Sequence, residues 1–213
     1  MGRLIVIEGM DGAGKRTLAE GLGAQLRARG FSSSHAAFPR YDTDVHAELV
    51  REALHGAHGD LGASVYGMAV LYALDRRGAV EALRAQLAEH DIVLLDRYVA
   101  SNAAYGAARL RQGADGEFVR WVHELEVERF AAPRPDLQLL LNVPATVAAD
   151  RAEHRERREQ DRDRDSFESD APLQQRVGEV YAQLAESGWW SPWLVVAGSD
   201  RPDYAELASL LTR

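Results

Sequence analysis

Lys15 is the only lysine among the 25 lysine and arginine residues of this chain, and it closes the segment Gly9-Met10-Asp11-Gly12-Ala13-Gly14-Lys15. Every other member of that set is an arginine, so a lysine here points to a chemical requirement. An ammonium on a flexible stem is a point charge that can follow a phosphate, whereas a guanidinium is a planar fork. The segment follows most of the Walker A pattern G-x-x-x-x-G-K-[ST], whose backbone N–H groups turn onto phosphate oxygens. We expect a phosphate-binding loop.

Arg16 is the one departure from that pattern, because it stands where a serine or threonine usually binds magnesium, and Thr17 comes one position late. Magnesium must then be held partly by other carboxylates or by water, and Arg16 could add positive charge at a transferred phosphoryl group. The alternative is a glycine turn with a stray lysine. The apolar run 4–7 before the loop and the helical spacing of residues 17–26 after it favour a phosphate loop, because phosphates would then meet a helix N-terminus.

Asp96 ends a second apolar run, 91–96, as the acid of a Walker B strand does. The next residue is Arg97, where many ATPase motors carry a second acid that activates water. The guanine-reading motif Asn-Lys-x-Asp is also absent, since there is no second lysine. We therefore expect phosphoryl transfer to a small acceptor, with Arg97 at the carboxyl end of the strand where ligands bind in such sheets. The competing interpretation of Asp96 and Arg97 is a surface ion pair.

Three further segments have side chains suited to an acceptor. Phe38, Arg40 and Tyr41 combine an aromatic platform with a guanidinium able to grip a monophosphate through two hydrogen bonds. Tyr72 and Arg76 are one helical turn apart and would share a face.

Ser101, Asn102 and Tyr105 follow Arg97, and the Asn102 amide carries both a donor and an acceptor to match a pyrimidine imide edge. Each of these segments taken alone is also explained by structure: Tyr72 by core packing and Asn102 by a cap or turn.

Five apolar runs alternate with helical stretches, at residues 4–7, 33–38, 91–96, 137–143 and 193–196. Continuous apolar strands separated by helices are typical of a parallel sheet covered on both faces. The fold class we expect is α/β, three-layered, with a five-stranded parallel sheet. Residues 1–213 should form one domain with a small lid segment, 144–168, and Gly30 should end the first helix.

The amino-acid composition limits the binding partners and the chemistry that we expect of this chain. The formal net charge of −8 argues against a nucleic-acid or membrane-surface partner, because both reward basic surfaces. There is no cysteine, hence no disulfide, thiolate metal site or cysteine nucleophile. No apolar run approaches the roughly 20 residues that a spanning helix needs, and the N-terminus enters a strand directly. A cytoplasmic location is the default expectation.

Four segments together resemble the thymidylate kinase family, in its order and at its spacing: Glu8 to Lys15, Phe38-Pro39-Arg40, Asp96-Arg97-Tyr98 and Ser101 to Tyr105. The Gly-Lys-Arg-Thr ending is similar to the actinobacterial branch. The resemblance implies a P-loop NTPase fold and transfer of the γ-phosphoryl of ATP to dTMP, with Mg²⁺. It implies catalytic roles for Asp11, Lys15, Arg16 and Arg97. The implied ATP-binding loop residues are Gly9, Asp11, Gly12, Ala13, Gly14, Lys15, Arg16 and Thr17.

The same resemblance assigns the acceptor site. Arg40 and Arg97 would clamp the dTMP phosphate, Tyr72 would stack on thymine, and Arg76 and Asn102 would read its polar edge. Tyr105 would crowd a 2′-hydroxyl and so favour the deoxy sugar. The dTMP site as a whole would comprise Asp11, Phe38, Arg40, Tyr41, Tyr72, Arg76, Arg97, Ser101, Asn102, Tyr105, Asp165 and Glu168. Asp11, Asp96 and Glu168 would serve the metal.

The lid carries six arginines and six acids within residues 151–165, so its charge balances. Arg151, Arg155, Arg158 and Arg162 are spaced by four, three and four residues, which on a helix gathers them within about 60° at roughly 100° per residue. Such a stripe could neutralise the γ-phosphoryl group as it moves. A solvated helix with internal ion pairs is the alternative.

Three other functions stay open from the residues alone. A deoxynucleoside kinase shares the loop but would have no use for a phosphate clamp. Another pyrimidine nucleoside monophosphate kinase keeps the clamp but should lack the crowding by Tyr105. A nucleotide-binding adaptor without turnover is favoured only by Arg16. Family resemblance also implies a homodimer. The segment 118–130, with Trp121, Val122, Leu125 and Val127, could be part of an apolar face, which core burial explains equally well.

Overall fold

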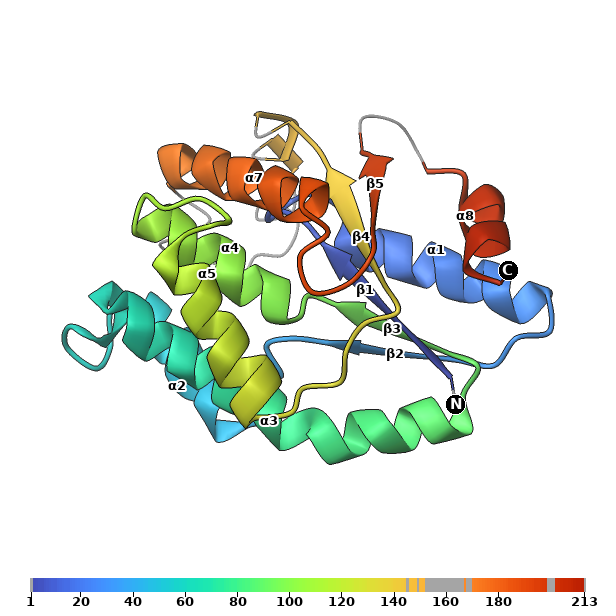
Figure 1. The fold of residues 1–213 in the computed structure, drawn as a ribbon, viewed down its shortest axis with the longest axis horizontal. Coiled ribbons are helices and arrows are strands. Elements are labelled where there is room, and N and C mark those ends of the chain that lie inside the picture. Colours follow the sequence, from blue (N-terminus) through green and yellow to red (C-terminus); the bar gives the residue numbers. More distant parts are fainter. Residues whose placement is uncertain are drawn as a thin grey trace.

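In the computed structural model, five strands form one parallel sheet in the order β2-β3-β1-β4-β5 (Figure 1). The structure describes residues 2–144, 146–148, 150–151, 167, 170–198 and 202–212. The strands are β1 (Arg3–Glu8), β2 (Ser33–Ala37), β3 (Ile92–Asp96), β4 (Leu137–Asn142) and β5 (Trp193–Ala197). All five predicted strands are confirmed, each with one or both ends displaced by a single residue.

Burial explains why these runs are continuous in apolar residues. The central strand β1 is buried from Leu4 onward, and β3 is buried over Ile92 to Leu95. The edge strands β2 and β5 are more exposed. A central parallel strand has helices over both faces, so alternation of polar and apolar residues is not expected there.

Helices cover both faces of the sheet, as the three-layer prediction requires (Figure 1). On one side α1 (Lys15–Ala28) packs against the strands and against α8 (Tyr204–Leu211). On the other side lie α3 (Val65–Glu89), α4 (Val99–Arg109) and α7 (Ala171–Glu186). Further helices are α2 (Val45–Leu54), α5 (Glu117–Val122), a 3-10 turn η1 (Leu61–Ala63) and a π-helix η2 (His123–Arg129).

Local signals set the helix ends. The first helix ends before Gly30, which has a φ of 86° and whose N–H donates to the carbonyl of Arg27. This confirms the predicted glycine cap, since glycine enters the left-handed region without a Cβ penalty. At the start of α3 the Ser64 hydroxyl accepts from the Gly67 N–H, and at the start of α7 Asp170 accepts from the Leu173 N–H.

The connections after β1, β2 and β3 all leave the carboxyl edge of the sheet, because the strands are parallel and adjacent. These connections carry the glycine loop, the Phe38 segment and Arg97, so topology alone brings the three predicted regions together. No helix in the described part of the chain is long and apolar enough to cross a membrane. Most of the predicted lid, 144–168, lies outside the described residues.

Candidate active site

The loop between β1 and α1 has the backbone of a phosphate-binding loop. Gly9, Gly12 and Gly14 have φ values of 148°, 78° and 98°, which other residues rarely adopt. A Cβ on Gly12 would also lie 2.0 Å from the backbone oxygen of Ala148, so there is no room for a side chain. Helix α1 begins directly at Lys15, two residues earlier than expected, and points its N-terminus at the loop.

A cavity of about 650 Å³ opens beside this loop at the carboxyl edge of the sheet. It joins predicted residues from five separate segments of the chain. Those lining it are Asp11, Gly12, Gly14, Lys15, Arg16, Thr17, Phe38, Tyr41, Tyr72, Arg76, Asp96, Arg97, Ser101, Asn102 and Tyr105. Glu20, Ala37, Pro39 and Phe167 complete the wall. The loop and most of the predicted acceptor residues therefore line one cavity.

Asp11, Arg97 and Tyr105 form a connected group in this wall. Nη2 of Arg97 lies 2.5 Å from Oδ1 of Asp11, and the Tyr105 hydroxyl donates to Oδ2 of Asp11 at 2.5 Å. Burial alone would raise the pKa of Asp11, but the charges of Arg97 and Lys15 and the hydrogen bond from Tyr105 outweigh it and lower that pKa to about 2. Asp11 is thus a carboxylate at neutral pH and holds the Arg97 guanidinium in place.

The buried carboxylate of Glu8, to which the sequence analysis gave no role, supports Arg97 through Ser101 and the backbone of Tyr98. The Arg97 backbone has a φ of 68°, a left-handed conformation that is costly for a residue with a Cβ. Glu8, fully buried at the end of β1, accepts from the Tyr98 N–H at 2.9 Å and from the Ser101 hydroxyl at 2.7 Å. Nη1 of Arg97 donates to that Ser101 oxygen at 3.2 Å. Burial raises the pKa of Glu8 despite these hydrogen bonds.

Lys15 and Asp96 line the cavity beside the glycine loop. The Lys15 ammonium donates to the carbonyl of Met10 at 2.9 Å, and burial lowers its pKa to about 8. Oδ1 of Asp96 is buried and has no hydrogen-bond partner among the described residues. An unpaired carboxylate oxygen beside a phosphate loop fits an Mg²⁺ ion or a water of its shell. No three His, Asp or Glu side chains within the described ranges gather into a metal cluster.

Arg16 is engaged at the protein surface. It forms a surface ion pair with Glu20 at 3.0 Å, and its side chain is 83% exposed. Both residues still line the cavity mouth.

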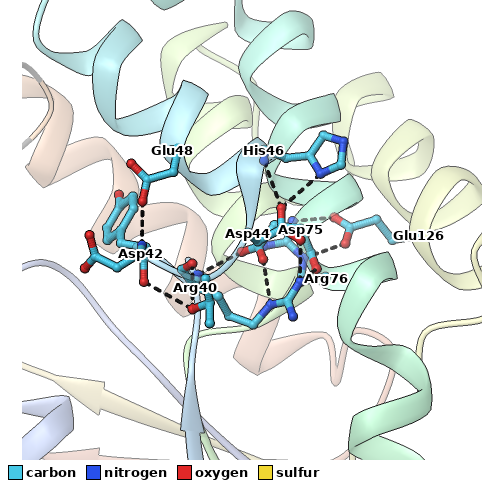
Figure 2. Close-up of polar contacts among 10 residues, drawn as sticks. Arg40, Asp42, Asp44, His46, Glu48, Asp75, Arg76 and Glu126 are labelled. Carbon is cyan, nitrogen blue, oxygen red and sulfur yellow. Dashed lines mark hydrogen bonds and ion pairs between the residues drawn. The ribbon is translucent and has the colours of Figure 1, made fainter.

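At another part of the wall, Arg76 and Asn102 meet a buried glutamate. Glu126, from η2, accepts from Nε and Nη2 of Arg76 at 2.5 and 2.8 Å (Figure 2). Its Oε1 also accepts from Nδ2 of Asn102 at 2.8 Å. Burial alone would lower the pKa of Arg76, but the Glu126 carboxylate outweighs it and the pKa rises above its usual value. Sequence analysis missed Glu126, although it follows the buried Phe118 and Val122 at helical spacing, which places it on the apolar face.

Arg40 does not line the cavity. Its Nε donates to Oδ1 of Asp75 at 2.7 Å and its Nη2 to Oδ2 of Asp44 at 2.7 Å, while its backbone N–H donates to Asp75 (Figure 2). These contacts fasten the segment after β2, which contains the cis peptide bond between Phe38 and Pro39, to helix α3. Arg97 therefore lines the cavity, whereas the Arg40 guanidinium is paired with Asp44 and Asp75. Binding of the acceptor phosphate by Arg40 stays a prediction.

Few of the predicted lid residues are described. Nη1 of Arg151 lies 3.4 Å from the carbonyl oxygen of Ala13 in the phosphate loop, so the start of the lid reaches the loop. Phe167 lines the cavity, with the Arg109 guanidinium 4.5 Å from its ring centroid. Arg155, Arg158, Arg162, Asp165 and Glu168 lie outside the described residues, and their roles stay predictions.

Comparison with known proteins decides which family has this site. A sequence profile described as "Thymidylate kinase" matches residues 7–197. The chain is 53% identical over 199 residues to a thymidylate kinase of Mycobacterium tuberculosis, strain H37Rv, covering 93% of each chain. It belongs to the thymidylate kinase family. It is also 33% identical over 193 residues to a probable thymidylate kinase of Thermococcus gammatolerans, covering 87% of this chain and 84% of that one.

Family membership confirms the predicted α/β P-loop fold and the resemblance to actinobacterial thymidylate kinases. The chain is an ATP-dependent nucleotide kinase, and the predicted transfer of a phosphoryl group to dTMP is confirmed at the level of the family. None of the alternative functions gains support.

Proposed function

We propose that this thymidylate kinase carries out the transfer from ATP to dTMP within the cavity between the phosphate loop and α4, with Mg²⁺. One observation carries the proposal: Lys15 and Asp96 line the same cavity as Tyr72, Arg76, Asn102 and Tyr105. Donor phosphates at the loop and a pyrimidine at the other residues would place the two substrates within reach of each other. Proximity of this kind can supply a large share of the barrier reduction.

In this proposal the loop glycines and Lys15 bind the ATP phosphates, and Arg97 binds the acceptor phosphate. Asp11 keeps Arg97 oriented and stays negative, since its pKa is about 2. The acceptor phosphate already carries a nucleophilic oxygen, so no general base is required, and catalysis comes from alignment and positive charge.

Asp96, with Asp11 and the predicted Glu168, would hold Mg²⁺ directly or through water. Bound Mg²⁺ would neutralise charge on the donor phosphates. Arg16 would turn from Glu20 toward the transferred group. That exposed ion pair is cheap to break, because exposed pairs contribute about 0–1 kcal/mol.

Residues 144–168 would close over ATP as a lid, with Arg151 already at the loop and Arg155, Arg158 and Arg162 following it. Asp165 and Glu168 would complete the acceptor side. Closure of this kind excludes water and so limits wasteful ATP hydrolysis.

We also propose that the chain acts in the cytoplasm as a homodimer. Tyr66 is 41% exposed and packs edge-on against Phe118 and Trp121, which supports an apolar contact surface on α3 and α5. Sedimentation should give twice the mass of one chain, and a monomer at micromolar concentration would contradict this part.

The deciding experiment measures ADP formation from ATP and Mg²⁺ with dTMP, dUMP, UMP, CMP and free thymidine as acceptors. A strong preference for dTMP over UMP and thymidine supports the assignment of clamp, base and sugar contacts. Turnover of thymidine without its phosphate would contradict the role of Arg97. Omission of Mg²⁺ should abolish turnover with every acceptor.

A further inference from the structure

Glu126 is a buried carboxylate, 1% exposed, for which the proposed phosphoryl transfer has no direct use. It sits in η2, where the Phe130 N–H donates to the carbonyl of Leu125, five residues back. Such π-helical turns are rare and occur often at functional sites. Glutamates are almost never fully buried unless they are paired, so the partners of Glu126 should explain its place.

Those partners are the two residues proposed to read the base. Both oxygens of Glu126 accept from Arg76, and Oε1 accepts from Asn102 as well. One carboxylate thus joins α3, η2 and α4 beside the cavity that Arg76 and Asn102 line. A buried carboxylate with three donors is well compensated and holds its partners in fixed orientations.

The contacts fix which way the Asn102 amide faces. Nδ2 donates to Oε1 of Glu126 at 2.8 Å and to the carbonyl of Ala69 at 3.0 Å, so both of its hydrogens are used. The reverse orientation would put Oδ1 against two acceptor oxygens. Among the described residues no donor contacts Oδ1, so Asn102 offers the cavity an acceptor only. This narrows the sequence-based expectation that the amide supplies both a donor and an acceptor.

Arg76, in contrast to Asn102, can offer the cavity only hydrogen-bond donors. Its Nε and Nη2 donate to Glu126, and Nη1 has no acceptor among the described residues. Arginine has donors and no acceptor, so what it can offer the cavity is N–H groups. At this part of the wall, Oδ1 of Asn102 is therefore the acceptor and the N–H groups of Arg76 are the donors.

We propose that Glu126 is a positioning residue that sets this acceptor–donor pattern and thereby selects an imide pyrimidine. Thymine and uracil carry N3–H and O4, which match Oδ1 of Asn102 and Nη1 of Arg76. Cytosine carries an unprotonated N3 and an amino group, which oppose both. The inference rests on the proposed function, because it requires the base of the acceptor to lie at these residues.

The test compares dUMP with dCMP, which differ only at this edge of the base. In the wild type, kcat/KM for dUMP should exceed that for dCMP at least tenfold, since a buried polar group left facing a like group is costly. Glu126→Gln introduces an amide N–H group beside Arg76 and Asn102, and with that group at the Oε1 position only the Ala69 carbonyl still opposes the reverse orientation of the Asn102 amide. The ratio should then fall at least tenfold, with dCMP improving in absolute terms and the KM for ATP unchanged.

Matched variants separate a specific change in base preference from a general loss of activity or folding. Glu124→Gln changes an exposed glutamate in the same helix and should leave the ratio as in the wild type. Glu126→Asp keeps an acceptor-only group and should keep the preference for dUMP even where rates drop. Equal losses with dUMP and dCMP in Glu126→Gln would mean a purely structural role and overturn the inference.

A measurement on the wild type covers the case in which Glu126→Gln does not fold. Both Asn102 side-chain N–H protons should exchange slowly with water in an NMR experiment on the free protein, and fast exchange would overturn the inference. Turnover of dTMP in the same assays tests the proposed function separately. Failure with dTMP would refute that function, whereas an unchanged ratio in an active Glu126→Gln enzyme would refute only the role of Glu126.

Discussion

Asp11 and Arg97 leave neighbouring strands β1 and β3, and Nη2 of Arg97 lies 2.5 Å from Oδ1 of Asp11 at the carboxyl edge of the sheet. One ion pair therefore ties the phosphate loop to the residue proposed to bind the acceptor phosphate. The pair is partly buried, with 15% of the Arg97 side chain and 23% of the Asp11 side chain exposed. It is screened less by salt than a surface pair would be. This ion pair therefore joins the proposed donor site to the proposed acceptor site.

Arg97→Lys should raise the KM for dTMP about 10- to 100-fold, with a much smaller change in the KM for ATP. A lysine keeps the charge but loses the fork that holds Asp11 and the acceptor phosphate at once. Steady-state kinetics with each substrate varied in turn would measure both values. Arg84→Lys, at an exposed ion pair with Glu81, is the control and should behave as the wild type. A larger effect on ATP than on dTMP would reassign Arg97 to the donor.

Lys15 should make ATP binding pH-dependent. Its pKa is lowered by burial to about 8, so in the free protein the ammonium is present below pH 8 and is lost as the pH rises through that value. ATP favours the charged form, hence its affinity should be constant below about pH 7.5 and should fall above pH 8, with proton uptake on binding. Calorimetry across pH 6.5 to 9.5 in buffers of different ionisation heat would show it. A flat affinity across that range would mean that Lys15 stays charged.

Tyr105→Phe should relax discrimination between ribose and deoxyribose acceptors. The hydroxyl is fixed by donating to Asp11 at 2.5 Å, and burial together with Asp11 raises its pKa, so it stays protonated. Its loss removes bulk beside the sugar and one contact to Asp11. The ratio of kcat/KM for dTMP to that for ribothymidine monophosphate should drop several-fold. An unchanged ratio would show that the ring, not the hydroxyl, excludes the ribose.

The parts of the molecule that sequence could predict are those governed by local chemistry. Buried parallel strands need continuous apolar runs, as in β1, and the phosphate loop needs glycines and one lysine, as at Gly14 and Lys15. Side-chain type and spacing singled out Tyr72 and Asn102 as acceptor residues, the family resemblance assigned their roles, and both line the cavity.

The missed features are pairings between distant segments. Arg76 meets Glu126 at a separation of 50 residues, and Arg40 meets Asp75 at a separation of 35. Spacing along the chain shows which face a side chain occupies, but not which charge of another helix will meet it. The orientation of the Asn102 amide follows from such a pairing, so it could not be predicted from the sequence and required the structure.

Substitutions at Gly12 and Gly30 can separate the cost of backbone strain from the cost of a steric clash with an added Cβ. Both have left-handed backbones, with φ values of 78° and 86°, but a Cβ on Gly12 would lie 2.0 Å from the oxygen of Ala148, whereas a Cβ on Gly30 would meet nothing within 4 Å. Gly30→Ala should therefore cost about 1–2 kcal/mol in the free energy of unfolding and leave activity unchanged. Gly12→Ala carries the same backbone strain and must in addition push the phosphate loop away from residue 148. It should raise the KM for ATP at least tenfold. Denaturant melts and ATP kinetics on both variants would decide, and equal ATP kinetics in the two would show that the close approach of loop and residue 148 is not needed for nucleotide binding.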